Sequence, residues 1–315
     1  MMSQQLQIII QQMIVFIILL GIGVIAARTK VLTTTVLDGL AKIVVNITLP
    51  AMIITMIPGA ATRDELIKAF PFLICSFFLI LVLFGLGRFT AKLTGLTGNT
   101  ADVHAAETTF GNVGFMGIPL IVALFGGQGI FNISVFSVAD HSLLWTLGSF
   151  LTAKEEGANI KGNLKKIVNP TTVALMAALV LVGLGIRPQG VVVDTIKGLG
   201  DTTRFLSMVY IGGTLAHLNF RQTWRKPSIF LVIFLKMMVA PLIVFSLLSL
   251  VKDFLPGEGV MTLTLIAALP SMVTIAMMAR ANGSDDIYAS ECVFLTTISS
   301  IVTIPLISFI IGKMM

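Results

Sequence analysis

The residues best suited to binding chemistry surround a stretch rich in glycine and proline. Residues 110–127 read FGNVGFMGIPLIVALFGG, an apolar run that carries Asn112, Gly114, Gly117 and Pro119. Glycine weakens a helix and proline removes a backbone donor from it, so this stretch predicts an interrupted helix. The N–H groups that begin a half-helix carry a partial positive charge, and they favour binding of an anion.

A second apolar stretch, residues 265–283, has a proline near its middle. We expect a half-helix to begin at each of the two prolines, with the following N–H groups and nearby amide and hydroxyl side chains holding a carboxylate. A simple proline kink in each stretch is the alternative interpretation. The predicted substrate-binding residues are Asn112, Gly114, Gly117, Pro119, Leu120, Pro270, Ser271 and Thr274.

Ionisable residues inside apolar runs are a second set of candidates, because a charge at the centre of a bilayer costs about 3 kcal/mol on insertion scales. Lys236 lies in the middle of such a run and must find a carboxylate partner or water. Four further residues are candidates for taking up a proton or a coupling ion, with a structural hydrogen bond or ion pair as the alternative: Glu107, Asp140, His141 and Glu291.

Known catalytic and metal-binding motifs do not occur in the sequence. The three histidines have no close ligand spacing, and there is no phosphate-binding loop and no nucleophile motif. We therefore expect no catalytic residues, no metal and no enzyme activity. The only cofactor that we expect is a coupling Na⁺ or H⁺.

The composition indicates the environment in which these residues lie. Of the 315 residues, 56% are hydrophobic and 11% are charged, whereas soluble domains carry about 25% charged residues. Apolar runs long enough to cross a bilayer recur along the chain, so we expect an all-α polytopic membrane protein. The ten predicted spans are roughly 8–27, 34–57, 68–94, 101–126, 130–152, 170–186, 191–217, 227–251, 259–281 and 286–312.

The ten spans divide into two halves. Residues 1–153 are predicted to form a first repeat of five spans, residues 154–169 a linker, and residues 170–315 a second repeat. An odd number of spans in each half makes the second repeat inverted, a frequent plan for secondary transporters. Residues 37–54 align with residues 196–213 at a similar offset to that between the two prolines. The interrupted spans four and nine then occupy corresponding positions and are expected to cross.

The basic residues predict the orientation. Twelve Lys and Arg residues lie on the side of the linker, and five lie on the other side. By the positive-inside rule the linker is cytoplasmic and both termini lie outside. The net charge of +6 therefore reports orientation, and we expect no nucleic-acid partner.

Three segments resemble the auxin efflux carrier family, which includes bacterial carriers of the malate- and malonate-permease type. They are GNVGFMGIPL (111–120), NITLPAMII (46–54) and AALPSM (267–272). The resemblance extends over the whole chain. It implies that spans 1, 2, 6 and 7 form a scaffold and that spans 3–5 and 8–10 form a mobile transport unit. It also implies that spans 4 and 9 cross at Pro119 and Pro270, with Asn112 as a substrate contact.

The function expected from these observations is secondary active transport of a small organic anion, malate or a related carboxylate, by an elevator-type mechanism. The short central linker indicates a bacterial inner-membrane carrier rather than an auxin carrier. The expected partners are the carboxylate and the lipid bilayer, and a homodimer is compatible with this function. The alternatives are a sodium-coupled symporter resembling the bile-acid carriers, a channel, and a non-transporting membrane sensor.

Overall fold

The computed structural model describes residues 2–60, 62–153, 170–216, 226–250, 255 and 257–314. These residues are almost entirely helical, and the regular strand pairing among them is a single isolated bridge between Gly111 and Ser271. The predicted cytoplasmic linker, residues 154–169, lies outside the described residues.

The helices before the linker include long apolar ones and shorter pieces that continue or connect them. They are α1 (Met2–Arg28), α2 (Thr34–Ile43), α3 (Leu49–Ala60), α4 (Arg63–Lys68), α5 (Phe70–Leu93), α6 (Gly98–Thr109), α7 (Ile118–Leu143) and α8 (Ser149–Leu151). Three π-helical turns join some of these pieces: η1 (Val44–Thr48), η2 (Val113–Gly117) and η3 (Leu144–Gly148).

The helices after the linker follow a similar pattern of long and interrupted pieces. They are α10 (Pro170–Gly183), α11 (Val191–Asp201), α12 (Thr203–Leu215), α14 (Pro227–Phe234), α15 (Ala240–Ser249), α16 (Gly257–Ala267), α17 (Val273–Ala281) and α18 (Asp286–Met314). One further π-helical turn, η5 (Leu235–Val239), joins α14 to α15.

The helix lengths and their apolar composition define a polytopic membrane protein. Six helical stretches of the described residues are long and apolar enough to cross a bilayer. They are Gln7–Arg28, Thr34–Gly59, Phe70–Leu93, Val113–Leu151, Pro227–Ser249 and Asp286–Met314. The prediction of an all-α polytopic membrane protein is confirmed, whereas the arrangement of ten spans as an inverted repeat stays a prediction.

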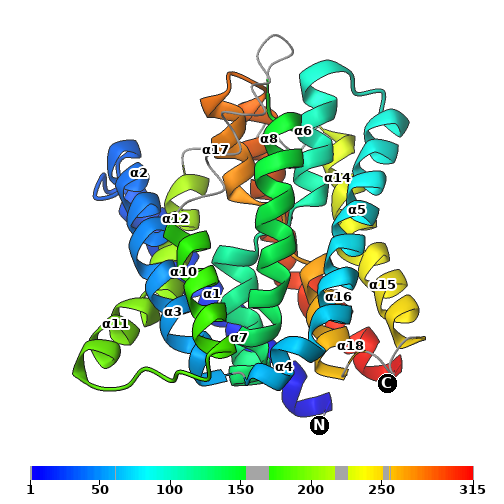
Figure 1. Cartoon of the computed structure of the whole chain (residues 1–315). Helices are drawn as coiled ribbons and strands as arrows, with labels where there is room; N and C mark the ends of the chain where they lie inside the picture. Colours follow the sequence, from blue (N-terminus) through cyan, green and yellow to red (C-terminus); the bar gives the residue numbers. More distant parts are fainter. Residues whose placement is uncertain are drawn as a thin grey trace.

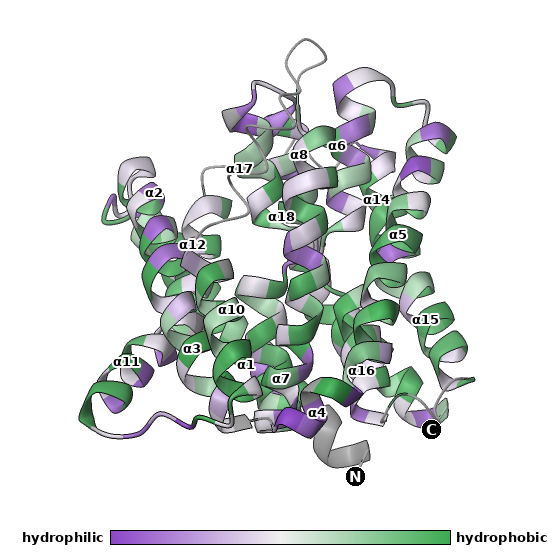
Figure 2. Ribbon diagram, viewed as in Figure 1, coloured by the Kyte–Doolittle hydropathy of each residue, from purple (hydrophilic) through white to green (hydrophobic). Residues whose placement is uncertain are grey.

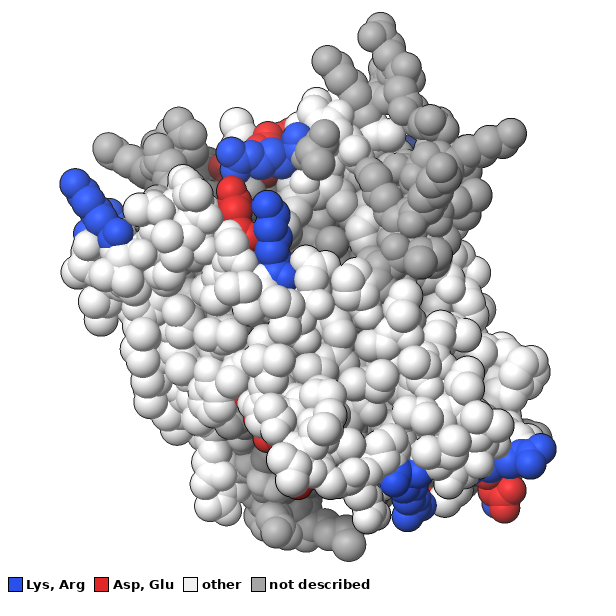
Figure 3. Space-filling model, turned by 60° about the vertical axis from the view of Figure 1, so that its left-hand side comes forward, with Lys and Arg blue, Asp and Glu red and all other residues white. Residues whose placement is uncertain are grey.

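The distribution of polarity agrees with this class. Hydrophilic residues gather mostly at the two ends of the helices, and hydrophobic residues dominate the length between them (Figure 2). On the face shown in Figure 3, the basic side chains lie at opposite ends of the molecule with a broad band of uncharged side chains between them. Such a band matches the hydrocarbon core of a bilayer, which excludes charge.

Three of the four π-helical turns among the described residues are followed by a proline, and this explains where they form. Pro50, Pro119 and Pro241 each lie two positions after the last residue of η1, η2 and η5. The residue before each proline donates its N–H five positions back, as Ile118 does to the carbonyl of Val113. A proline ring clashes with the carbonyl four positions earlier, and a widened turn accommodates that clash.

One long helix contains a sharp bend that requires glycine. In α7 the backbone of Gly126 has φ 55° and ψ −130°, and two helical pieces meet there. A side chain is strongly disfavoured in this conformation. The bend separates the end of the predicted fourth span from the predicted fifth span.

The helices pack as two groups. α7 belongs to the second group and lies near the middle of the molecule, where it also contacts α1 and α3 of the first (Figure 1). The first helix group consists of α1–α3 and α10–α12, where α3 packs on α10 and α11, and α12 on α1 and α2. The second helix group consists of α5–α8 and α14–α18, where α5 packs on α6, α15 on α16, and α18 on α14 and α17. Both chain ends lie at the same end of the molecule (Figure 1).

Glycines allow α1 and α12 to approach at backbone distance. A Cβ atom added to Gly23 would lie 2.2 Å from the carbonyl oxygen of Val209, and one added to Gly212 would lie 2.2 Å from that of Leu20. Small residues at helix interfaces permit this close packing in membranes.

This packing gives the first prediction. Gly23→Ala should lower the melting temperature of the detergent-solubilised protein, because the new methyl group must push α12 away. Gly21→Ala is the matched control on the same helix, since nothing lies within 4 Å of its added Cβ. Alanine is favoured over glycine in a helix by about 0.5–1 kcal/mol, so the control should be neutral or more stable. Equal melting temperatures of the two variants would contradict the contact.

Candidate functional site

Two interrupted helices cross and complete each other's backbone hydrogen bonds. α6 ends before Gly111 and α16 ends before Ser271, and these two residues form an antiparallel bridge. The N–H of Asn112 donates to the carbonyl oxygen of Pro270 at 2.8 Å. The chain then resumes as helix in η2 and in α17. Each break therefore supplies partners that the bilayer does not offer.

The crossing differs from the expectation that spans four and nine cross at Pro119 and Pro270. Pro119 lies near the start of α7, which continues η2 without a break, so no half-helix begins there. The break occurs at Gly111, where the two segments approach closely: a Cβ added to Gly111 would lie 3.1 Å from Cβ of Leu269. Glycine favours this close approach. In the other stretch Pro270 does lie in the break, but the half-helix begins three residues later, at Val273.

A buried lysine from η5 binds the carbonyl groups at the C-terminal end of α6, the first half of the interrupted helix. The Lys236 ammonium, which is 0% exposed, donates to the carbonyl oxygens of Glu107 at 2.8 Å and of Phe110 at 3.0 Å. The hydroxyl of Ser271 donates to the same Glu107 carbonyl at 3.0 Å. Carbonyl groups at a helix C-terminus carry partial negative charge and lack partners within the helix. Lys236 thus caps α6 at the crossing.

Asn112 starts the second half of the same helix. Its side-chain oxygen accepts a hydrogen bond from the N–H of Phe115 at 3.3 Å, which is the usual role of an N-cap residue. Its side-chain nitrogen is buried and has no hydrogen-bond partner among the residues that the structure describes. This amide is available to a ligand next to the helix start.

A cavity of about 220 Å³ lies beside the crossing. Both helix groups line it, so it lies at their interface. The first group contributes Asn46, Leu49, Ile53 and Thr171. The second group contributes Asn112, Val113, Gly114, Phe115, Ile118, Ser137, Asp140, His141, Leu144, Trp145, Met272 and Thr274.

The predicted binding residues divide into two sets. Those that line the cavity are Asn112, Gly114, Asp140, His141 and Thr274. Those that do not are Gly117, Pro119, Leu120, Pro270, Ser271, Glu107 and Glu291. Pro119 and Leu120 lie inside the helix that continues η2, and the Ser271 N–H donates to the Thr296 hydroxyl at 3.0 Å rather than into the cavity.

Several residues that line the cavity were not predicted from the sequence, among them Asn46, Trp145 and Thr171. Asn46 belongs to the segment NITLPAMII, and its place beside a proline in a span was the available signal. Trp145 and Thr171 carry no such signal, because only the packing of α10 and η3 against the crossing brings them to the cavity.

The acidic wall of the cavity comes from α7. Asp140 is 1% exposed, and its Oδ2 makes no hydrogen bond within the described part of the chain. The His141 Nδ1 donates to the Ser137 carbonyl at 2.9 Å and lies 3.9 Å from that Oδ2. The Lys236 ammonium interacts electrostatically with both Asp140 and Glu107.

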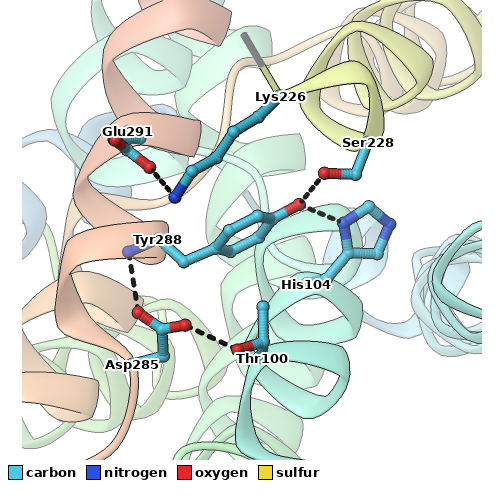
Figure 4. Close-up of polar contacts among 7 residues, drawn as sticks. All are labelled: Thr100, His104, Lys226, Ser228, Asp285, Tyr288 and Glu291. Carbon is cyan, nitrogen blue, oxygen red and sulfur yellow. Dashed lines mark hydrogen bonds and ion pairs between the residues drawn. The ribbon is translucent and has the colours of Figure 1, made fainter. Parts of the chain in front are cut away.

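Glu291 belongs to a different polar network, at the end of α18 away from the C-terminus. It forms an ion pair with Lys226 (Figure 4), and this ammonium lies over the ring of Tyr288. The Tyr288 hydroxyl lies between His104 Nδ1, at 2.7 Å, and the Ser228 hydroxyl, at 2.8 Å (Figure 4). These contacts join α6, α14 and α18 within the second helix group.

A metal-binding cluster in the described residues would consist of His, Cys, Asp and Glu side chains. Within the described ranges, no group of three or more His, Cys, Asp and Glu side chains is placed to hold a metal ion.

The buried crossing, the cavity beside it and the apolar helices together define a membrane transport protein. A family model described as membrane transport protein matches residues 8–163 and 157–308, and the chain belongs to this family. The chain is also 26% identical over 222 residues to an uncharacterized transporter of Methanothermobacter thermautotrophicus, an alignment that covers 70% of this chain and 72% of that protein. The resemblance to the auxin efflux carrier family is confirmed.

The lysine cap gives the second prediction. Lys236→Met should destabilise the protein by about 3–5 kcal/mol, because it leaves two buried carbonyls and the nearby carboxylates without their cation. Lys42→Met is the control, since Lys42 is exposed, and it should change stability by about 0.5 kcal/mol or less. Thermal unfolding followed by tryptophan fluorescence or by light scattering measures both. Unchanged stability of the Lys236 variant would show that the cap is dispensable.

The network of Figure 4 gives the third prediction. Tyr288→Phe leaves the buried His104 and Ser228 without their shared partner, and should cost about 1–3 kcal/mol. Tyr210→Phe is the matched control, because the Tyr210 hydroxyl makes a weak 3.8 Å contact with the sulfur of Met277. The melting temperature should fall for the first variant and stay close to wild type for the second. The reverse order would refute the role of the network.

Proposed function

We propose that this protein is a secondary active transporter of a small organic anion, malate or a related carboxylate, and that the anion binds in the cavity beside the crossing. The observation that carries this proposal is the buried Asn112 amide nitrogen, which has no hydrogen-bond partner among the described residues and belongs to a residue that lines the cavity at the start of a half-helix. Helix N-termini and amide donors hold carboxylates without a buried basic side chain.

The size and lining of the cavity support a small substrate. Its volume of about 220 Å³ is below the usual range of about 300–1,000 Å³ for drug-sized ligands. The Thr274 hydroxyl lies in the first turn of α17, so a second half-helix start also borders the cavity. A dicarboxylate such as malate has two groups that these two starts would bind.

The fold that we propose is the ten-span inverted repeat. Gly111 and Ser271, which bridge at the crossing, are 160 positions apart, close to half the chain length. A pair of interrupted helices in corresponding positions is typical of transporters built from such repeats. In this proposal residues 1–153 and 170–315 are the repeats, and both termini face outside.

The mechanism that we propose is movement of the second helix group against the first. Because both groups line the cavity, a shift between them would open it to one side and close it from the other. The contacts that must slide include Gly114 against Leu49, where an added Cβ would lie 3.8 Å from a Leu49 methyl group, and the ring contact of Phe115 with Tyr210 at 5.8 Å. The first group would be the scaffold and the second the transport unit.

The fourth prediction tests the site. Purified protein in proteoliposomes should take up labelled malate with saturation, and Asn112→Asp should reduce the uptake at least about tenfold, as loss of roughly 1.4 kcal/mol of binding would. Aspartate still caps the helix, so the fold is retained, but it replaces the amide donor by a negative charge.

The control for this test is Asn282→Asp. Asn282 follows α17, donates to the Thr152 hydroxyl and does not line the cavity, so its variant should transport like wild type. Uptake that is equal in the Asn112 variant and wild type would contradict the site. Absence of malate uptake, and of competition by other carboxylates, would contradict the carrier proposal.

A further inference from the structure

The cavity contains a charge that opposes its proposed ligand. Asp140 lines the cavity with a side chain that is 1% exposed, and an ionised carboxylate there would repel a bound anion. At about 4 Å two like charges repel by about 4 kcal/mol even at an effective dielectric constant of 20. Binding of an anion therefore requires that the Asp140 charge be neutralised.

The groups around Asp140 do not neutralise it fully. Among the described residues, the ammonium that interacts with Asp140 is that of Lys236 on η5, which also interacts with the Glu107 carboxylate on α6 and donates to two carbonyls at the end of that helix. If both carboxylates were ionised, one ammonium would leave a net negative charge beside the cavity. The Cys292 thiol on α18 also interacts with Lys236 and supplies no positive charge.

His141 does not compensate for this charge. Because a carbonyl oxygen only accepts hydrogen bonds, the His141 Nδ1 carries a hydrogen that it donates to Ser137, and it lies 3.9 Å from the Asp140 Oδ2. That distance is too long for a hydrogen bond. Asp140 thus lines the proposed anion site, and its Oδ2 has no hydrogen-bond donor among the described residues.

Asp140 is also the carboxylate that can exchange a proton with the cavity. Glu107 is 0% exposed, and it is absent from the cavity wall. A proton that arrives through the water of the cavity reaches Asp140 first. A protonated Asp140 would also offer its O–H as a hydrogen-bond donor to the anion.

We propose that Asp140 binds one proton together with each anion, so that the protein carries the anion with a proton. This inference rests on the function proposed above. The proton comes from water on the side where the anion enters, forms an O–H bond at the Asp140 carboxylate, and returns to water on the side where the anion leaves. No other bond is made or broken. The remaining Lys236–Glu107 pair is then electrically balanced during the movement.

The test uses labelled malate and proteoliposomes whose membrane potential is clamped at zero. With sodium equal on both sides, a pH gradient of about one unit, acid outside, should drive accumulation of up to about tenfold above equilibrium, the ratio that one coupled proton supports. A sodium gradient at equal pH should drive none. Accumulation driven by sodium and not by the pH gradient would overturn the proposal.

Three variants assign the proton to a residue. Asp140→Asn should bring malate only to equilibrium under the pH gradient, because the amide binds no proton. Asp140→Glu should restore gradient-driven accumulation, and Glu291→Gln, in the separate network with Lys226, should retain it. Accumulation by the Asn variant, or its loss in the Glu291 variant alone, would overturn the assignment to Asp140.

The wild-type experiment separates the two proposals. If wild-type protein takes up no malate under either gradient, the carrier proposal itself fails. If it takes up malate only to equilibrium under the pH gradient, transport stands and proton coupling fails. This comparison does not depend on the folding of any variant.

Discussion

The structure depends on one constraint: two segments of the chain that leave the helical conformation inside the bilayer must provide each other's hydrogen bonds. Asn112 donates to the Pro270 carbonyl, and the carbonyls at the end of α6 are bonded by Lys236 and by the Ser271 hydroxyl. Lipid offers no substitute for these partners, and each polar group left alone there costs several kcal/mol. The crossing is therefore a single unit. Removing one member exposes the others, which explains why a lysine is kept where no water reaches it.

The same constraint concentrates polarity at one place. Residues at the helix starts that the breaks create, Asn112 and Thr274 among them, line a cavity between two groups of apolar helices. The negative end of α6 is bonded to Lys236 instead. An asymmetric arrangement of this kind presents positive helix ends to a ligand and shields the negative ones. Asp140 also lines this cavity, and in our proposal its position there connects anion binding to protonation.

Local sequence chemistry accounts for much of the helical framework. The apolar runs, the glycine at position 126 and the prolines that follow three π-helical turns act through their own backbone geometry, so their effects are readable without a structure. Pro119 shows the limit of such reading. It was expected to begin a half-helix. Instead, the widened turn η2 accommodates the proline, and the helix continues from η2 into α7 without a break. The break lies at Gly111 instead, where the segment bridges Ser271 and passes close to Leu269, contacts that local sequence does not reveal.

The sequence by itself determined that the chain is an all-α membrane protein, that two stretches are interrupted, and that Asn112 and Asp140 are unusual among their apolar neighbours. These properties follow from residue type and spacing, which act over a few residues. Only the tertiary structure decided that Gly111 meets Ser271, that Lys236 caps a helix 126 to 129 positions away, and that Asn46 and Thr171 share a cavity with Asn112. Such contacts join segments far apart in the chain, and they exist because buried polar groups must find partners wherever packing brings one within reach.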